Sequence, residues 1–149
     1  MINVNEKMIL NYVETLKAKH NITILSNASA YLNEYIEEIN WVGFYLNIDG
    51  LLILGPFQGK VACQEIAFGK GVVGTCATKK EAIIVDNVLE FKGHIACDPN
   101  SRSEVVIPVF KGDFLYGILD IDSAKFNRFS EKDVEILKEF VKKIEAILN

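Results

Sequence analysis

The stretch that decides the fold is Trp41-Val42-Gly43-Phe44-Tyr45-Leu46-Asn47-Ile48. It is rich in aromatic and β-branched residues, and it ends at Asp49-Gly50, a pair typical of a tight hairpin turn. Leu51–Leu54 continues as the partner strand, and Gly55-Pro56 is expected to bend it. The sequence therefore predicts that a β-sheet begins at residue 41.

Side chains alternate between the two faces of a strand, so this segment has two different faces. One face is plainly apolar and is predicted to pack on the core; it carries Val42, Phe44 and Leu46. The other face is expected to border a pocket; it carries Trp41, Gly43 and Tyr45.

Apolar residues recur at three- and four-residue steps near both ends of the chain, which is typical of amphipathic helices. The spacing predicts a first helix over residues 5–17, with Tyr12 on its apolar face, and a second over 22–36 with Asn21 as its cap. Ser130-Glu131-Lys132-Asp133 is a capping sequence with acidic first-turn residues, and it opens a terminal helix.

The remaining elements follow from strand-like runs separated by turn residues. Gly69–Thr75 lacks the Gly-Lys-Ser/Thr ending of a phosphate-binding loop, so these glycines are expected to lead into a helix. We predict a third strand over 61–67 that carries Cys63, a helix over 72–78, a strand over 82–85, a long loop over 86–103, and two strands over 104–110 and 114–122 joined at 111–113.

These elements predict one α+β domain over residues 1–149, with a central antiparallel sheet. The N- and C-terminal helices are expected on one face of the sheet, and a ligand pocket covered by loops on the other. Loops as long as 86–103 are usually functional in compact domains, which points to this loop as part of the pocket.

Composition disfavours two classes of partner. The net charge is −4 and the lysines are scattered, so the sequence disfavours nucleic-acid binding. No apolar run approaches the roughly 20 residues of a membrane span, and the N-terminus lacks the basic and apolar regions of a signal peptide. We therefore expect a cytoplasmic protein that does not enter a membrane.

The chain has three cysteines, Cys63, Cys76 and Cys97, an odd number that argues against a structural disulfide framework. Two histidines and no Cys-x-x-Cys pair also argue against structural zinc. Cys97 lies in the polar loop Gly93–Asn100, three residues after His94. Two interpretations stay open from the residues alone: a reactive thiol on a turn, or a small buried hydrophobe.

Two carboxylates, Asp120 and Asp122, share one face of a predicted strand. Like charges at this spacing repel, so they need solvent, a cation or a shared proton. A solvated strand end is the plain alternative to a functional pair.

Several motifs together resemble the free methionine-R-sulfoxide reductases, which are single GAF-domain enzymes. The motifs are Trp41–Tyr45, Gly59–Cys63, Gly93–Asp98, Ser103-Glu104 and Leu119–Ser123. The resemblance implies a GAF fold and reduction of the R epimer of free methionine sulfoxide. It also implies electrons from thioredoxin. We expect no bound cofactor and no metal. The matching positions are Cys63 and Cys97 for two family cysteines, and Trp41, Tyr45, Glu104, Asp120 and Asp122 for the substrate pocket.

On this basis Cys97 is the expected nucleophile and Cys63 the resolving thiol, which form a disulfide that thioredoxin reduces. Glu104 with Asp122 is the expected proton donor, and Asp120 shares that role or binds the substrate ammonium group. His94 either lowers the pKa of Cys97 or stabilises the turn.

One departure from the family pattern is Val73, where a third cysteine is common. Cys76 lies one helical turn further on, and it is either a displaced third thiol or an inert core residue. Two other functions compete with the reductase: a non-catalytic GAF sensor of a small metabolite, and a thiol redox sensor. A homodimer through the terminal helices is a further expectation.

Overall fold

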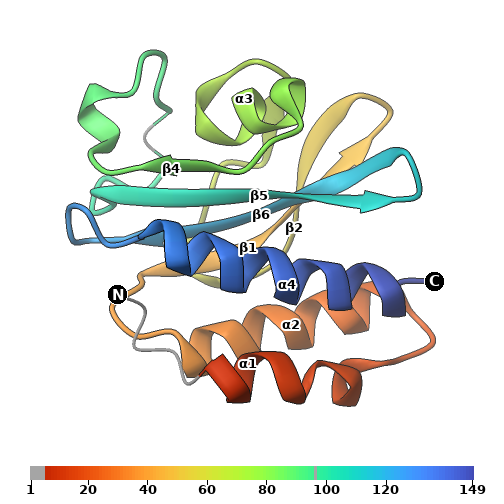
Figure 1. Ribbon diagram of the computed structural model, residues 1–149. Helices are drawn as coiled ribbons and strands as arrows, with labels where there is room; N and C mark the ends of the chain where they lie inside the picture. The colour runs from red at the N-terminus through yellow and green to blue at the C-terminus, as the bar shows by residue number, and fades with distance from the viewer. Residues whose placement is uncertain (1–5, 96) are drawn as a thin grey trace.

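An antiparallel sheet forms the centre of the computed structural model, and helices cover its two faces unequally (Figure 1). The structure describes residues 6–95 and 97–149, and within these residues six strands pair in the order β3-β2-β1-β6-β5-β4. The elements in chain order are α1 (Glu6–Asn11), η1 (Val13–Leu16), α2 (Asn21–Tyr35), β1 (Trp41–Ile48), β2 (Leu51–Gly59), β3 (Glu65–Ala67), α3 (Gly71–Lys79), β4 (Ile83–Val85), η2 (Val88–Glu90), β5 (Ser103–Lys111), β6 (Phe114–Ser123) and α4 (Glu131–Ile147).

The larger core lies between the sheet and the helices α1, α2 and α4, which Figure 1 shows together below the sheet. Helix α4 begins with the predicted capping box, in which Ser130 and Asp133 exchange side-chain and backbone hydrogen bonds. Its apolar stripe includes Phe140, which is fully buried. Burial of such a side chain stabilises the fold by roughly 1.5–3 kcal/mol, so this stripe fixes α4 on the sheet.

The opposite face of the sheet carries a smaller core and the pocket. Helix α3 and the segments beside it lie on this side (Figure 1). The alternation along β1 divides its side chains as predicted: Val42 and Phe44 enter the larger core, while Trp41 and Tyr45 enter the smaller one. The structure thus confirms the predicted α+β class, with terminal helices on one face and a pocket on the other.

The first predicted helix is wrong as a continuous element. The α-helical part ends at Asn11, and residues 13–16 form a 3-10 helix in which the Thr15 amide donates to the Tyr12 carbonyl at 3.1 Å. Tyr12 is half exposed rather than buried. Thr15 also donates its hydroxyl to the same carbonyl, and this local side-chain bond competes with regular helix geometry.

Asn21 is not the cap of the second helix. The structure makes it the first residue of α2, after His20 in the cap position. Its side chain instead pairs with the end of the chain, because its Oδ1 accepts from the backbone amide of Asn149 at 2.7 Å. A partner 128 residues away in sequence therefore replaces the local capping bond.

The third strand is shorter than predicted, and Cys63 does not lie on it. Only Glu65–Ala67 pairs with β2, whereas β2 itself runs through Gly55-Pro56 to Gly59. Residues 60–63 leave the sheet edge because two side chains of β1 bind backbone carbonyl groups at the ends of this segment. Trp41 binds the carbonyl of Lys60, and Tyr45 binds that of Cys63. This path brings Cys63 over the pocket.

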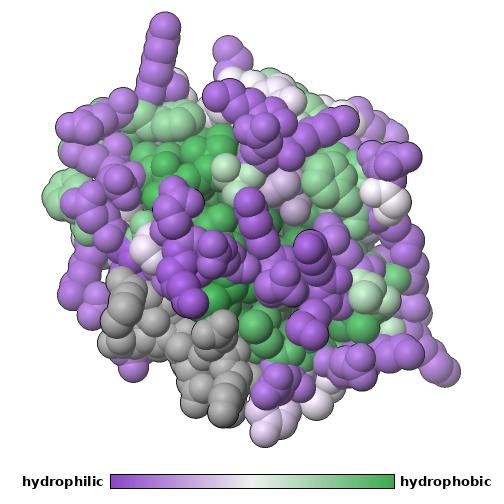
Figure 2. Space-filling view, in the orientation of Figure 1, coloured by the Kyte–Doolittle hydropathy of each residue, from purple (hydrophilic) through white to green (hydrophobic). Residues whose placement is uncertain are grey.

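In the part of the chain that the structure describes, no helix combines the length and hydrophobicity needed to cross a bilayer. Figure 2 shows mostly hydrophilic side chains on the face where α4 lies in front, with hydrophobic side chains visible between them. This agrees with a helix that turns its apolar stripe toward the sheet.

Candidate active site

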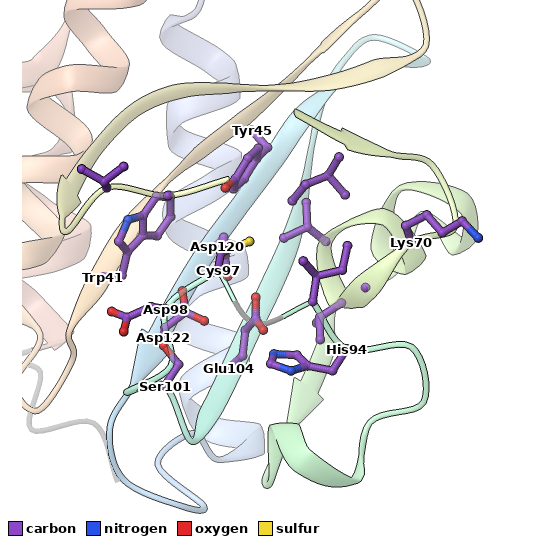
Figure 3. A pocket seen from close by; sticks show the side chains of 17 residues that line it. Trp41, Tyr45, Lys70, His94, Cys97, Asp98, Ser101, Glu104, Asp120 and Asp122 are labelled. Carbon is purple, nitrogen blue, oxygen red and sulfur yellow. The ribbon is translucent and has the colours of Figure 1, made fainter. Parts of the chain in front are cut away.

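The pocket lies on the face of the sheet opposite the terminal helices, between β1, β5, β6, α3 and the loop that carries Cys97. Its cavity measures about 40 Å³. Figure 3 shows Trp41 and Tyr45 projecting from β1 on one side, with the carboxyl groups of Glu104 and Asp122 on another. Every site residue predicted from the sequence except Cys63 and Cys76 lines this cavity, and Cys63 adjoins it beside Ala62.

A disulfide joins Cys63 to Cys97, with 5.4 Å between their Cα atoms. The two residues are 34 positions apart in sequence and both are half-buried. Cys97 therefore lies on a bend at the pocket, outside both apolar cores of the described residues. A half-buried disulfide beside a cavity can exchange with an external thiol.

Trp41 and Tyr45 hold the chain segment that leads to Cys63. The Trp41 indole Nε1 donates to the Lys60 carbonyl at 3.1 Å, and the Tyr45 hydroxyl donates to the Cys63 carbonyl at 2.9 Å. Burial and nearby carboxylates raise the pKa of Tyr45, so its hydroxyl stays protonated and able to donate. The family resemblance placed these aromatic residues in the substrate pocket, and the residues alone suggested ordinary core side chains; neither predicted this second contact.

Three carboxyl groups meet in the floor of the pocket. Glu104 on β5 lies directly opposite Asp122 on β6, and Asp120 follows on the same face of β6. One oxygen from each group lies within 4.8 Å of the others, and the residues are only 5%, 6% and 9% exposed for Glu104, Asp120 and Asp122. The solvated strand end considered for Asp120 and Asp122 is therefore wrong.

Burial raises the pKa of all three carboxyl groups, and mutual repulsion adds to the effect for two of them. The pKa values of Glu104 and Asp122 rise well above the ordinary range, first through desolvation and then through neighbouring charges. The pKa of Asp120 rises to about 6 through desolvation, opposed by hydrogen bonds from Glu104 and Asp122. The cluster thus holds protons at neutral pH, with the negative charge placed most readily on Asp120.

Such a cluster has the spacing to share a cation as well as protons. The raised pKa values indicate protonation as the way in which the charge is relieved. An ammonium group of a ligand offers a third way, and Asp120 suits it because its buried Oδ1 has no hydrogen-bond partner within residues 6–95 and 97–149.

Cations contribute little to the described pocket. Lys70 is exposed, and Figure 3 shows its side chain projecting away from the carboxyl groups. His94 lines the cavity, but burial lowers its pKa and favours the neutral imidazole. A neutral ring gives no charge to stabilise a Cys97 thiolate, so the structure favours the turn role for His94.

Cys76 stands apart from this site. It is fully buried in α3, does not line the cavity, and contacts the Glu81 carbonyl through its sulfur at 3.2 Å. Burial raises its pKa to about 12, whereas reactive cysteines need a lowered pKa. These observations support the inert-core interpretation. Val73 lines the pocket at the position where the third cysteine is common.

Asn40, Asp98 and Ser101 were not recognised from the sequence as site residues. Asp98 and Ser101 line the pocket next to Cys97, and Asn40 binds both of them. The sequence showed only that the polar residue Asn40 precedes β1, and this pattern alone predicts no more than the start of a strand.

The comparisons with known proteins agree with this geometry. The family model described as a GAF domain matches residues 23–149. The chain is 45% identical over 127 residues to the free methionine-R-sulfoxide reductase of Escherichia coli strain K12, covering 85% of this chain and 77% of that protein.

The structure also resembles solved structures of the fRMsr of Staphylococcus aureus. The reduced form superposes with a TM-score of 0.95 at 48% identity, covering 100% of this chain and 99% of the other. The complex of that protein with its substrate superposes with a TM-score of 0.93 at 47% identity, with the same coverage. The chain therefore belongs to the GAF-domain family and, within it, to the free methionine-R-sulfoxide reductases.

Proposed function

We propose that this protein reduces free L-methionine (R)-S-oxide to L-methionine, with Cys97 as the nucleophile and Cys63 as the resolving thiol. The observation that carries the proposal is the Cys63–Cys97 disulfide beside a pocket floored by three proton-holding carboxyl groups. Membership of a family whose relatives are named for this activity supports the choice of substrate.

The first step transfers oxygen from the substrate to the enzyme. The Cys97 thiolate attacks the sulfoxide sulfur while the oxygen takes up protons, which leaves Cys97 as sulfenic acid and releases methionine. The Cys63 thiol then attacks the Cys97 sulfur, water leaves, and the disulfide forms. In the disulfide the two Cα atoms lie 5.4 Å apart, a normal spacing for this bond, which supports direct formation of the bond between the two segments.

The acidic cluster supplies the proton. A protonated carboxyl group is required, and Glu104 and Asp122 both have raised pKa values that keep a proton available near neutral pH. Asp120 carries the remaining negative charge and suits the substrate ammonium group. Free amino acids present that group, which fits a substrate outside a peptide chain.

The aromatic residues fit the other end of the substrate. Trp41 and Tyr45 stack with their ring centroids 6.0 Å apart and border the cavity. The electron-rich face of an aromatic ring attracts a partly positive S-methyl group, as in known sulfur–aromatic contacts. We assign these two residues to the methyl and sulfur of the substrate.

The disulfide must be reduced for a further cycle, and we propose thioredoxin as the electron donor in the cytoplasm. In thiol–disulfide exchange, a thiolate of the donor attacks one sulfur and the second donor thiol completes the exchange. Both cysteines are half-buried at the edge of the pocket, which supports access from outside. A homodimer through the terminal helices remains part of the proposal.

A stoichiometry experiment tests this chemistry without any recycling system. Fully reduced protein is mixed with excess R epimer, and methionine and free thiols are counted after rapid quenching. The proposal predicts one methionine released and two thiols lost per chain, with Cys76 still free. Methionine release without loss of thiols would contradict it.

A further inference from the structure

We propose that Asn40 is a positioning residue that holds the Cys97 loop in place for catalysis. The inference rests on the proposed role of Cys97, and it concerns a residue outside the cavity lining. Asn40 lies immediately before β1 and joins the loop that follows Cys97 to the acidic strand β6.

The contacts of Asn40 reach both parts of the site. Its side-chain Nδ2 donates to the Asp98 Oδ2 at 2.9 Å and to the Ser101 Oγ at 3.1 Å. Its backbone amide donates to the Asp122 carbonyl at 2.9 Å. One residue therefore connects the cysteine loop with the strand that carries two of the three carboxyl groups.

The orientation of the amide group follows from the charge of Asp98. A reversed amide would place the Asn40 carbonyl oxygen against the Asp98 carboxylate, where two acceptors repel. In the observed orientation the Oδ1 atom of Asn40 is buried without a hydrogen-bond partner among the described residues. The two bonds that Nδ2 donates to the loop therefore outweigh the cost of leaving Oδ1 unsatisfied, and they fix the orientation of the Asn40 amide group.

Hydrogen bonds tie the loop after Cys97 into a compact turn. Asp98 accepts from the Asn100 amide through Oδ1 at 2.9 Å, and its carbonyl accepts from the Ser101 amide at 3.2 Å. Asn40 binds this turn at Asp98, the residue next to Cys97 in the chain. A shift of Asp98 would thus shift Cys97 as well.

Asn40 matters most in the reduced protein. In the oxidised form the disulfide to Cys63 also holds Cys97. When the disulfide is reduced, this covalent link is gone, and the Asn40 bonds remain to fix the loop during the attack on substrate. A misplacement of about 1 Å at a reacting group can lower the rate by about 100-fold.

The test reverses the hydrogen bond. Asn40→Asp places a carboxylate against Asp98, and we expect kcat for the R epimer to fall about 10- to 100-fold. The double variant Asn40→Asp with Asp98→Asn restores a donor and an acceptor in the opposite order, and it should recover to within about threefold of the wild type. Asn33→Asp, the same change on the exposed surface of α2, is the matched control.

A second readout does not depend on the activity. In a background with Cys63→Ser and Cys76→Ser, the rate of alkylation of Cys97 is measured against pH. Asn40→Asp should shift this profile, and the double variant should restore it.

Equal kcat values and equal alkylation profiles for wild type and Asn40→Asp would overturn the inference. A double variant no better than Asn40→Asp would overturn it too, because a restored donor–acceptor pair should return the loop to its position. Absence of turnover in the wild type would refute the proposed function, while the alkylation profiles would still decide the role of Asn40.

Discussion

Glu104 and Asp122 lie directly opposite each other in the antiparallel pair of β5 and β6, on the face that borders the pocket. Two ionised carboxylates in such a cross-strand pair would repel. Their raised pKa values show how the repulsion is relieved: the pair keeps a proton. The buried pair of carboxyl groups destabilises the fold, and it also holds the proton that we assign to the sulfoxide oxygen.

Removal of the acidic proton from the Glu104–Asp122 pair should lower the rate of the chemical step more than the affinity for the substrate. We expect Glu104→Gln to lower kcat by about 10²- to 10⁴-fold, the range for loss of a general acid. Asp113→Asn, in the turn between β5 and β6, is the control and should keep the wild-type rate. Steady-state assays with the R epimer decide; a rate within threefold of wild type for Glu104→Gln would remove this residue from the proton-donor role.

The acidic cluster should also make stability depend on pH in an unusual direction. The pKa of Asp120 is raised from 3.8 to about 6, so the folded state binds its proton more tightly than the unfolded state. The stabilising contribution is complete below pH 3.8 and is lost as the pH rises through about 6. Asp120→Asn should therefore raise the free energy of unfolding at pH 7.5 by about 1–3 kcal/mol and have a smaller effect at pH 4.

Urea unfolding at both pH values measures this effect, again with Asp113→Asn as the control. A lower stability of Asp120→Asn at pH 7.5 than at pH 4, each relative to wild type, would contradict the assignment of a raised pKa.

Replacement of the two disulfide cysteines should block different steps of the catalytic cycle. Cys97→Ser should abolish turnover, because no thiolate remains to attack the substrate. Cys63→Ser should release one methionine per chain and then stop with thioredoxin as the donor, since no disulfide can form. Rapid-quench measurement of methionine separates these outcomes, and multiple turnovers by Cys97→Ser would show that another thiol attacks.

Cys76 should take no part in turnover and should react slowly with thiol reagents. Its burial and raised pKa predict slow reaction with iodoacetamide in the folded protein and normal turnover for Cys76→Ala. Mass spectrometry of the labelled protein gives the rate, with the unfolded protein as the positive control. An oxidised enzyme that accumulates in Cys76→Ala would identify Cys76 as a resolving thiol.

Tyr45 should affect the recycling half of the cycle. Tyr45→Phe removes the hydroxyl that donates to the Cys63 carbonyl, while the aromatic wall remains. We expect slower disulfide formation after the first methionine is released, and a loss of about 1 kcal/mol in stability. Tyr12→Phe, on a half-exposed residue, is the control. If disulfide formation is unchanged, this hydrogen bond has no part in placing Cys63.

Local patterns predicted most of the elements. The alternation over residues 41–48 identified β1 and both of its faces, and the capping sequence at Ser130 identified the start of α4. These features depend on neighbours in sequence, so a sequence shows them directly. The hairpin between β5 and β6 was visible in the same way.

Apart from the first helix, which a local bond between Thr15 and Tyr12 interrupts, the following errors and omissions have a different cause: they depend on contacts between distant segments. Cys63 leaves the sheet because Tyr45 binds its carbonyl, and Asn21 does not cap α2 because it binds Asn149. Asn40 is a site residue only through its hydrogen bonds to Asp98 and Ser101, which lie about 60 residues away in sequence. The pairing of Cys63 with Cys97 came from the family resemblance, because spacing alone allows any pair among three cysteines.

The central claim is the reduction of one epimer of a free amino acid by this protein. The most direct measurement incubates the wild-type protein with both epimers of free methionine sulfoxide and a thioredoxin recycling system, and follows each epimer by chiral separation. The account predicts loss of the R epimer alone, with an equal amount of methionine formed. If neither epimer is consumed, or if the S epimer disappears instead, the account is contradicted.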